Sequence, residues 1–138
     1  MDTTFSMIKP DATARNLVGA IIQKLESEGL KLQAGRLTRI TPSLCETFYQ
    51  DHKSKPFFKS LINFMLSGPV FVMALKGEKA VEKVRKIMGH TDPAQARPGT
   101  IRALYGESIE RNSIHGSDSL PNADRELALF FNKTEWKW

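Results

Sequence analysis

The sequence predicts an α+β fold, in which helices cover a four-stranded antiparallel sheet. Three observations lead to this prediction: short apolar runs suit strands, the segments between them have helical periodicity, and glycine or proline follows most segments. The order is strand, helix, strand, helical insert, strand, helix, long loop and strand. Without the insert this is βαββαβ, the ferredoxin-like pattern, with helices on one face of the sheet. We expect a single domain over residues 1–138.

The first elements are a strand, a helix and a second strand. Residues 4–8 (TFSMI) form a strand that ends before a proline. The apolar residues between positions 17 and 25 fall on one helical face, and Gly29 stops that helix. The strand over residues 30–37 alternates in polarity but changes phase at Gly35-Arg36, which predicts a bend or bulge there.

The helical insert comes next. Thr41 is suited to cap a helix that has proline at its first position and continues through Tyr49. A basic loop over residues 53–56 (KSKP) leads to a second short helix over residues 57–66, which Gly68-Pro69 stops.

The second half contains a strand, a helix and a long polar segment. Residues 70–75 (VFVMAL) are apolar throughout, as in a buried strand, and residues 78–88 have one apolar helical face. Residues 90–100 (HTDPAQARPGT) have no periodicity, and loops of this length are often functional. A helix is expected to start near Asn122, and residues 127–131 (LALFF) are either the last strand or the end of that helix.

Composition and charge restrict the function. The 138 residues contain no apolar run long enough for a membrane span, and the N-terminus does not resemble a signal peptide. The single cysteine, Cys45, fits a reducing cytoplasm. The formal net charge of +5 favours an anionic partner, and nucleotides, nucleic acids and acidic proteins all qualify.

Motifs exclude several further classes. The sequence has neither G-x-x-x-x-G-K-[ST] nor G-x-G-x-x-G, and it lacks the H-R-D and D-F-G motifs of protein kinases. One cysteine and three scattered histidines match no zinc-ligand spacing. The strand at 70–75 lacks the glycine-aromatic pattern of RNA-binding ferredoxin-like domains, so no specific nucleic acid is expected.

One histidine stands apart from the other two. His115 lies in NSIHGSDS, where Gly116 leaves room for close approach and the following serines and aspartate can bond the backbone. Glu126 can hold one ring nitrogen and leave the other free as a nucleophile. These residues alone support two interpretations equally: an oriented nucleophile, or a turn followed by a helix cap.

Further motifs decide between these interpretations. NSIHGSDS closely resembles N-x-x-H-G-S-D, the active-site signature of nucleoside diphosphate kinases. Further segments match the family in order and spacing from about residue 3 to residue 131. They are KPDATARNLVG, KPFF, LSGPV, GHTDPAQARPGTIR and the late glutamate. Several independent motifs in order are far more specific than one histidine, and the chain resembles a family member of bacterial length.

The resemblance implies a ping-pong transfer of the γ-phosphoryl group of ATP to nucleoside diphosphates, which maintains the pools of other nucleoside triphosphates. The phosphoryl group passes through Nδ1 of His115, which Glu126 and Ser117 orient. The remaining site residues form a polar pocket with an aromatic end. By resemblance, Lys9 contacts the ribose and the transferring phosphate, and Asn112 bonds the ribose. Phosphate oxygens are expected to be held by Arg85, Thr91 and Arg102, and Tyr49 is expected to lie near the nucleophile. Phe57 is expected to stack on the base, with Leu61 one turn away.

The resemblance also implies a cofactor and partners. Mg²⁺ would bridge the β- and γ-phosphates, and we name no protein ligand for it. The substrates are nucleoside di- and triphosphates. The short C-terminus favours a tetramer over a hexamer or a dimer, and the two terminal tryptophans are expected to pack on the body or on a neighbour. The alternative functions are a nucleic-acid or regulatory protein-binding module and a catalytically silent relative.

Overall fold

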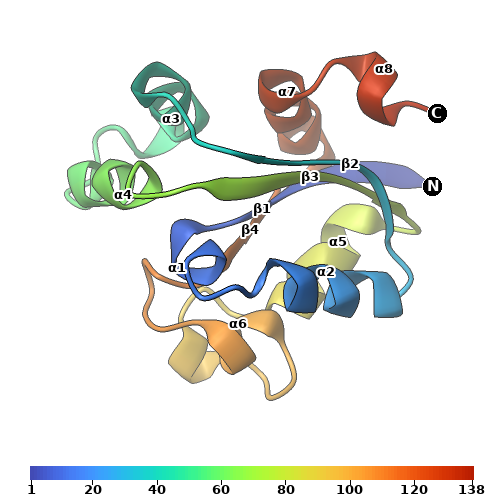
Figure 1. The fold of residues 1–138 in the computed structure, drawn as a ribbon, viewed down its shortest axis with the longest axis horizontal. Coiled ribbons are helices and arrows are strands. Elements are labelled where there is room, and N and C mark those ends of the chain that lie inside the picture. The colour runs from blue at the N-terminus through green and yellow to red at the C-terminus, as the bar shows by residue number, and fades with distance from the viewer.

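A four-stranded antiparallel sheet lies at the centre of the computed structural model, which describes residues 1–138 (Figure 1). The strands are β1 (Asp2–Ile8), β2 (Lys31–Thr38), β3 (Val70–Gly77) and β4 (Ile114–Gly116), and their order across the sheet is β2-β3-β1-β4. All three neighbouring pairs are antiparallel. The α+β class and the ferredoxin-like arrangement predicted from the sequence are therefore confirmed.

Helices cover both faces of this sheet, whereas the sequence predicts them on one face. The crossover helices α2 (Val18–Ser27) and α5 (Ala80–Met88) cover the expected face, and α3 (Pro42–Phe48), α4 (Phe58–Met65) and α7 (Leu120–Phe130) cover the other. The reason lies in the central strands. Val72 of β3 packs into the core under the inserted helices, while Met73 packs into the core under α5. A strand that is apolar on both faces must be covered on both.

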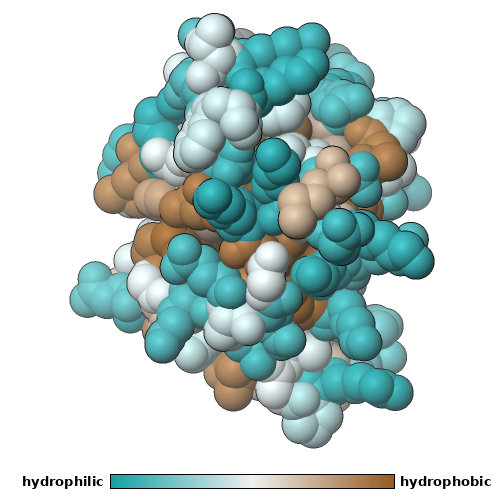
Figure 2. All heavy atoms as spheres, turned by 90° about the vertical axis from the view of Figure 1, so that its right-hand side faces the viewer, coloured by the Kyte–Doolittle hydropathy of each residue, from teal (hydrophilic) through white to brown (hydrophobic).

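The shorter elements complete the chain. They are α1 (Pro10–Thr13), the 3₁₀ turns η1 (Gln50–His52) and η2 (Pro93–Gln95), α6 (Ile101–Tyr105) and α8 (Lys133–Trp136). The long polar segment therefore contains η2 and leads into α6. Figure 2 shows a mostly hydrophilic surface, with hydrophobic side chains visible mainly in a band at the level of the sheet. None of the helices has the length and apolar character that a membrane crossing requires.

The last strand is not at residues 127–131. That run lies at the end of α7, which Ser119 caps by accepting a hydrogen bond from the N–H of Asn122. The fourth strand is instead β4, three residues long, and His115 is its middle residue. Three residues between polar neighbours carry no periodicity that would predict a strand. Pairing with β1 at the edge of the sheet defines the strand.

The irregularity in β2 also differs from its predicted position. The register shifts between Leu32 and Ala34, not at Gly35-Arg36. Gly35 is close to the Phe71 ring, where an added Cβ would lie 2.8 Å from a ring carbon, so glycine is needed there for close packing. The shift occurs at Gln33, whose side chain is buried and points to the C-terminal segment.

The C-terminal segment packs on the body of the same chain, which was one of the two expected outcomes. The Gln33 amide donates hydrogen bonds to the carbonyl oxygens of Trp136 (3.2 Å) and Trp138 (2.9 Å). These bonds hold α8 beside β2.

Candidate active site

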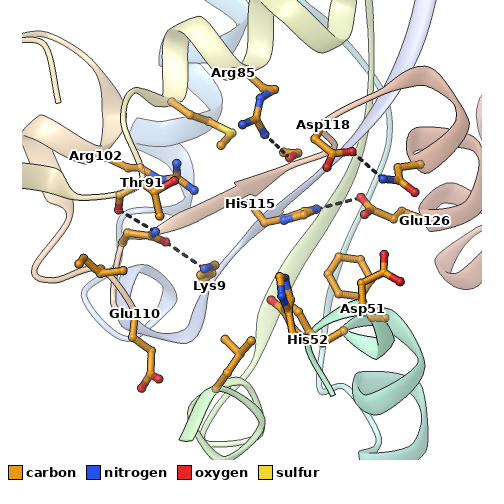
Figure 3. A pocket seen from close by; sticks show the side chains of 18 of the residues that line it. Lys9, Asp51, His52, Arg85, Thr91, Arg102, Glu110, His115, Asp118 and Glu126 are labelled. Atoms are coloured by element: carbon orange, nitrogen blue, oxygen red, sulfur yellow. Dashed lines mark hydrogen bonds and ion pairs between the residues drawn. The ribbon is translucent and has the colours of Figure 1, made fainter. Parts of the chain in front are cut away.

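A cavity of about 620 Å³ opens beside β4, and side chains from both halves of the chain converge on it (Figure 3). It is lined by the predicted site residues Lys9, Tyr49, Phe57, Leu61, Arg85, Thr91, Arg102, Asn112, His115 and Glu126. Ser117 does not line the cavity, but it bonds Glu126. The structure thus brings together residues that the sequence separates by more than a hundred positions.

His115 is held at two points. Its carbonyl oxygen accepts a hydrogen bond from the Ser6 hydroxyl (2.7 Å), which fixes β4 to β1. Its Nε2 lies 2.8 Å from Oε1 of Glu126, and the Ser117 hydroxyl donates to the same oxygen at 2.6 Å. Because a neutral imidazole donates through only one nitrogen, Nε2–H faces the carboxylate and Nδ1 keeps its lone pair.

The surroundings of His115 favour the neutral ring. Its side chain is only 22% exposed, and the Phe48 ring packs against it edge-on with centroids 5.0 Å apart. Burial lowers the pKa of His115 most strongly, Glu126 raises it, and Lys9 and Arg102 lower it; the net change is downward. An imidazole with a lowered pKa is unprotonated at neutral pH and able to act as a nucleophile.

Lys9 begins a short hydrogen-bonded chain along the cavity wall. Its Nζ donates to Oδ1 of Asn112 (2.9 Å), and the amide of Asn112 donates to the carbonyl oxygen of Thr91 (3.1 Å). Burial and then Arg102 lower the pKa of Lys9 to about 8. The sequence alone suggests a solvated lysine, but the end of β1 buries this side chain within the cavity wall.

Two arginines approach the cavity from different helices. Arg102 lies in α6 and is buried, although it reads as a loop cation in the sequence. Its guanidinium donates to the carbonyl oxygens of Gly89 (3.1 Å) and Ile114 (2.7 Å), and burial and then Arg85 lower its pKa to about 10. Arg85 is exposed on α5 and donates to the carbonyl oxygen of Gly116 (3.3 Å).

Three positive charges of the cavity have no ion pair with a carboxylate, whereas a fourth, Arg125, pairs with Glu126 (3.7 Å). None of Lys9, Arg85 and Arg102 takes part in any of the ion pairs of the structure. Like charges that lower one another's pKa create a site for an anion. A planar guanidinium offers paired donors to the oxygens of a phosphate.

The other end of the cavity is aromatic. Phe57 is 48% exposed, and His52 lies between it and Tyr49, with ring centroids 5.6 Å and 6.1 Å away. Leu61 is buried one turn after Phe57. Tyr49 is buried, its hydroxyl has no hydrogen-bond partner, and burial raises its pKa. This end therefore offers an exposed phenyl face and one free hydroxyl.

Several lining residues were missed by the sequence analysis: Phe48, Asp51, His52, Met88, Ile109, Glu110, Asn122 and Arg125. Phe48, Asp51 and His52 are close neighbours of Tyr49 in the chain, and this proximity was the available signal. The others lie on helices or in loops without a recognisable motif.

Gly116 lines the cavity, and its missing side chain also has a packing role. An added Cβ would lie 2.5 Å from Sδ of Met88 and 2.9 Å from Cγ1 of Val84. Glycine at this position thus lets α5 pack closely against β4. No group of three or more His, Cys, Asp or Glu side chains is arranged to hold a metal ion. Asp118 lines the cavity, and its hydrogen bond from Asn122 is the main reason for its lowered pKa.

The chain is similar to known proteins over nearly its whole length. A family model described as nucleoside diphosphate kinase matches residues 2–136. The nucleoside diphosphate kinase of Wolinella succinogenes is 53% identical over 135 residues, and that of Nitratiruptor sp. is 51% identical; each match covers 98% of both chains. The solved structure of the Aquifex aeolicus nucleoside diphosphate kinase has a TM-score of 0.95 at 38% identity and 98% coverage of both chains. The Halobacterium salinarum nucleoside diphosphate kinase, solved in complex with CDP, has a TM-score of 0.94 at 45% identity, covering 98% of this chain and 90% of that one.

Proposed function

The chain belongs to the nucleoside diphosphate kinase family, and on this premise we propose that His115 carries the phosphoryl group between two nucleotides. In the first half-reaction Nδ1 attacks the γ-phosphorus of a nucleoside triphosphate such as ATP. The N–P bond forms as the bond to the β,γ-bridging oxygen breaks, and the nucleoside diphosphate leaves. In the second, a terminal oxygen of another nucleoside diphosphate attacks the phosphohistidine, which restores the neutral ring. This ping-pong exchange maintains the pools of nucleoside triphosphates other than ATP.

The observation that carries this proposal is the hydrogen bond between Nε2 of His115 and Glu126. At 2.8 Å it fixes the tautomer that leaves Nδ1 as the free nitrogen, and the Ser117 hydroxyl holds the carboxylate in place. Glu126 and Ser117 are therefore proposed as orienting residues. A fixed nucleophile matters because phosphoryl transfer asks the protein mainly for alignment and charge stabilisation.

The unpaired cations serve the phosphates. Arg85 and Arg102 are proposed to hold phosphate oxygens, with the exposed hydroxyl of Thr91 as a further donor. Lys9 is proposed to contact the transferring phosphate and the ribose, and its partner Asn112 to bond the ribose as well. The free hydroxyl of Tyr49 is the remaining donor near the nucleophile.

Phe57 and Leu61 are proposed as the base platform. Half of the Phe57 surface is exposed at the cavity, which suits stacking on a purine or pyrimidine. Stacking contacts the face of a ring and not its edge, so all bases are accepted. The CDP complex of the Halobacterium relative supports a nucleotide in this cavity.

A phosphotransferase of this family uses a divalent metal, and we propose Mg²⁺. Mg²⁺ is commonly held by one or two carboxylates together with substrate phosphates and water, and we propose that it arrives with the nucleotide. When bound, it neutralises charge on the β- and γ-phosphates. We name no protein ligand for it.

The test is the phosphoenzyme itself. Incubation with ATP and Mg²⁺ is expected to add one phosphoryl group to the intact mass, labile in acid, and His115→Ala is expected to abolish both the adduct and phosphoryl exchange. His90→Ala is the matched control, because His90 is exposed and does not line the cavity. Absence of an adduct on the native chain, or its persistence in His115→Ala, contradicts the proposal.

Three further properties are proposed with it. Residues 1–138 act as one domain and assemble as a homo-oligomer, for which the family resemblance favours a tetramer over a hexamer or a dimer. Light scattering after size exclusion measures that number directly. The cytoplasm is the proposed location, and the single cysteine, buried Cys45, suits a reducing compartment.

A further inference from the structure

A strained turn joins Asn112 to the strand of the nucleophile. The N–H of Ile114 donates to the carbonyl oxygen of Asn112 at 2.9 Å, so the hydrogen bond encloses only Ser113. Ser113 has a φ of 75°. A γ-turn with positive φ is a rare conformation that costs free energy in any residue other than glycine.

The conformation of Ser113 is held by a buried carboxylate. Ser113 is fully buried, and its hydroxyl donates to Oδ2 of Asp11 at 3.0 Å. Asp11 is also buried, and Arg15 contacts it through two hydrogen bonds, one to Oδ2 (3.4 Å) and one to its carbonyl oxygen (3.0 Å). The same arginine donates to the carbonyl oxygen of Tyr105 (2.6 Å), so the position of Asp11 is fixed from both sides.

Both ends of the turn carry cavity residues. On one side Asn112 bonds Nζ of Lys9, and on the other Ile114 leads directly to His115. The backbone closes the connection, because the N–H of Lys9 donates to the carbonyl oxygen of Ser113 at 2.9 Å. A change in the turn would therefore move Asn112 relative to Lys9 and His115.

We propose that Asp11 is a positioning residue for phosphoryl transfer. Through the Ser113 hydroxyl it stabilises the strained turn in the one conformation that places Asn112 against Lys9 and His115 in the cavity. Asp11 does not line the cavity. The proposed function is the premise for calling this conformation productive.

The charge of Asp11 has a second, separable effect on Lys9. Burial lowers the pKa of Lys9 most strongly and Arg102 from α6 lowers it further, whereas Asp11 from α1 and Glu110 from the loop before the turn raise it. His115 of β4 is the remaining titratable group beside Lys9. Removing the charge of Asp11 is thus expected to move the pKa of Lys9 below about 8.

The experiment compares Asp11→Asn, Ser113→Ala and the double variant. Ser113→Ala removes the hydroxyl and keeps the charge of Asp11. We therefore expect kcat/KM to fall about tenfold at every pH, while its alkaline limb, the decline of kcat/KM at high pH, stays at the same pH. Asp11→Asn is expected to lose a similar factor and to move the alkaline limb to lower pH. The double variant is expected to be no worse than Asp11→Asn, because both changes act on the same hydrogen bond between Ser113 and Asp11.

Thr13→Ala is the matched control. It removes a hydrogen bond from the same helix, to the carbonyl oxygen of Pro69 (2.7 Å), without touching the turn. The kcat/KM of the folded control and its alkaline limb are expected to match the native chain. A native kcat/KM in Ser113→Ala, or losses that multiply in the double variant, would overturn the positioning role of Asp11, and an unmoved limb in Asp11→Asn would refute the effect of its charge on Lys9.

Two measurements keep the test decisive. Titration of Lys9 by ¹⁵N NMR without nucleotide reports the effect of Asp11 on its pKa even if no phosphoenzyme forms, which separates this proposal from the proposed function. If Asp11→Asn does not fold, Ser113→Gly replaces it, because glycine takes positive φ without strain. Ser113→Gly is expected to keep kcat/KM within about threefold of native, and an equal loss in Ser113→Gly and Ser113→Ala would refute the role of the strained turn.

Discussion

Glu126 offers the most direct measure of how far orientation of His115 contributes to the reaction. Its carboxylate is 5% exposed, and Oε1 accepts from both His115 (2.8 Å) and Ser117 (2.6 Å). Glu126→Gln keeps an acceptor oxygen and removes the charge. A hydrogen bond to a charged group contributes about 1.5–3 kcal/mol and a neutral one about 0.5–1.5 kcal/mol, so the loss is about 1.4 kcal/mol, or tenfold in rate.

Glu126→Ala removes the acceptor as well, which frees the tautomer and the ring torsion of His115. We expect about a further tenfold loss, roughly hundredfold in total. Neither loss can come from protonation of the nucleophile. Glu126 raises the pKa of His115, so its removal lowers that pKa and moves the acid limb of kcat/KM to lower pH.

Single-turnover phosphorylation by ATP, measured across pH, tests both points. Glu28→Gln is the control, since it makes the same chemical change at an exposed pair with Lys24 on α2. A rate of phosphorylation of Glu126→Ala within twofold of native, or a shift of the acid limb to higher pH, would contradict the orienting role of Glu126.

The remaining predictions concern the base platform and the packing behind the nucleophile. Phe57→Ala is expected to raise KM about tenfold for adenine, guanine, cytosine and uracil nucleotides alike, because stacking contributes about 1–3 kcal/mol per base; a rise confined to purines would show a base-specific contact instead. Gly116→Ala is expected to lower the free energy of unfolding in urea by about 1–3 kcal/mol, because its Cβ would lie 2.9 Å from the stiff Val84 side chain. Gly19→Ala, at a helical glycine with no atom within 4 Å of an added Cβ, is its control and is expected to be stabilising; equal effects of the two would refute the packing argument.

The sequence predicts this fold well where a segment has its own local signal. The strands at β1 and β3, the helices α2 to α5 and the Thr41 cap all carry a periodicity or a stop residue, and each lies within a few residues of its predicted bounds. The sequence predicts less of the fold where tertiary contacts determine the secondary structure. The three residues of β4 are a strand only because β1 pairs with them, and at the register shift the Gln33 side chain bonds carbonyl groups about a hundred positions away.

The sequence likewise predicts the candidate site where the signal is local, and not where burial and tertiary contacts determine it. The histidine motif and its spacing to Glu126 are local, and the structure places Nε2 of His115 2.8 Å from Oε1 of Glu126. Burial is not local. Arg102 reads as a loop cation, yet it lies in α6 with two carbonyl partners, and Gly116, which lines the cavity, also lets α5 pack closely against β4. His52 has no motif of its own, and only the fold places it between Tyr49 and Phe57.

The charge of the cavity shows why such a site needs its substrate. Burial and Arg102 lower the pKa of Lys9, and burial and Arg85 lower that of Arg102, so each cation disfavours the charged form of the next. Carboxylates paired directly with these cations would relieve this repulsion, but they would compete with the incoming phosphates. By leaving the three cations without ion pairs, the fold gives up stability that an anion restores. Burial is the main reason that the pKa of His115 is lowered, and the same repulsion adds to it, since a proton on the ring would place a further positive charge beside Lys9 and Arg102. A buried site among cations therefore both attracts the phosphate and keeps its acceptor unprotonated.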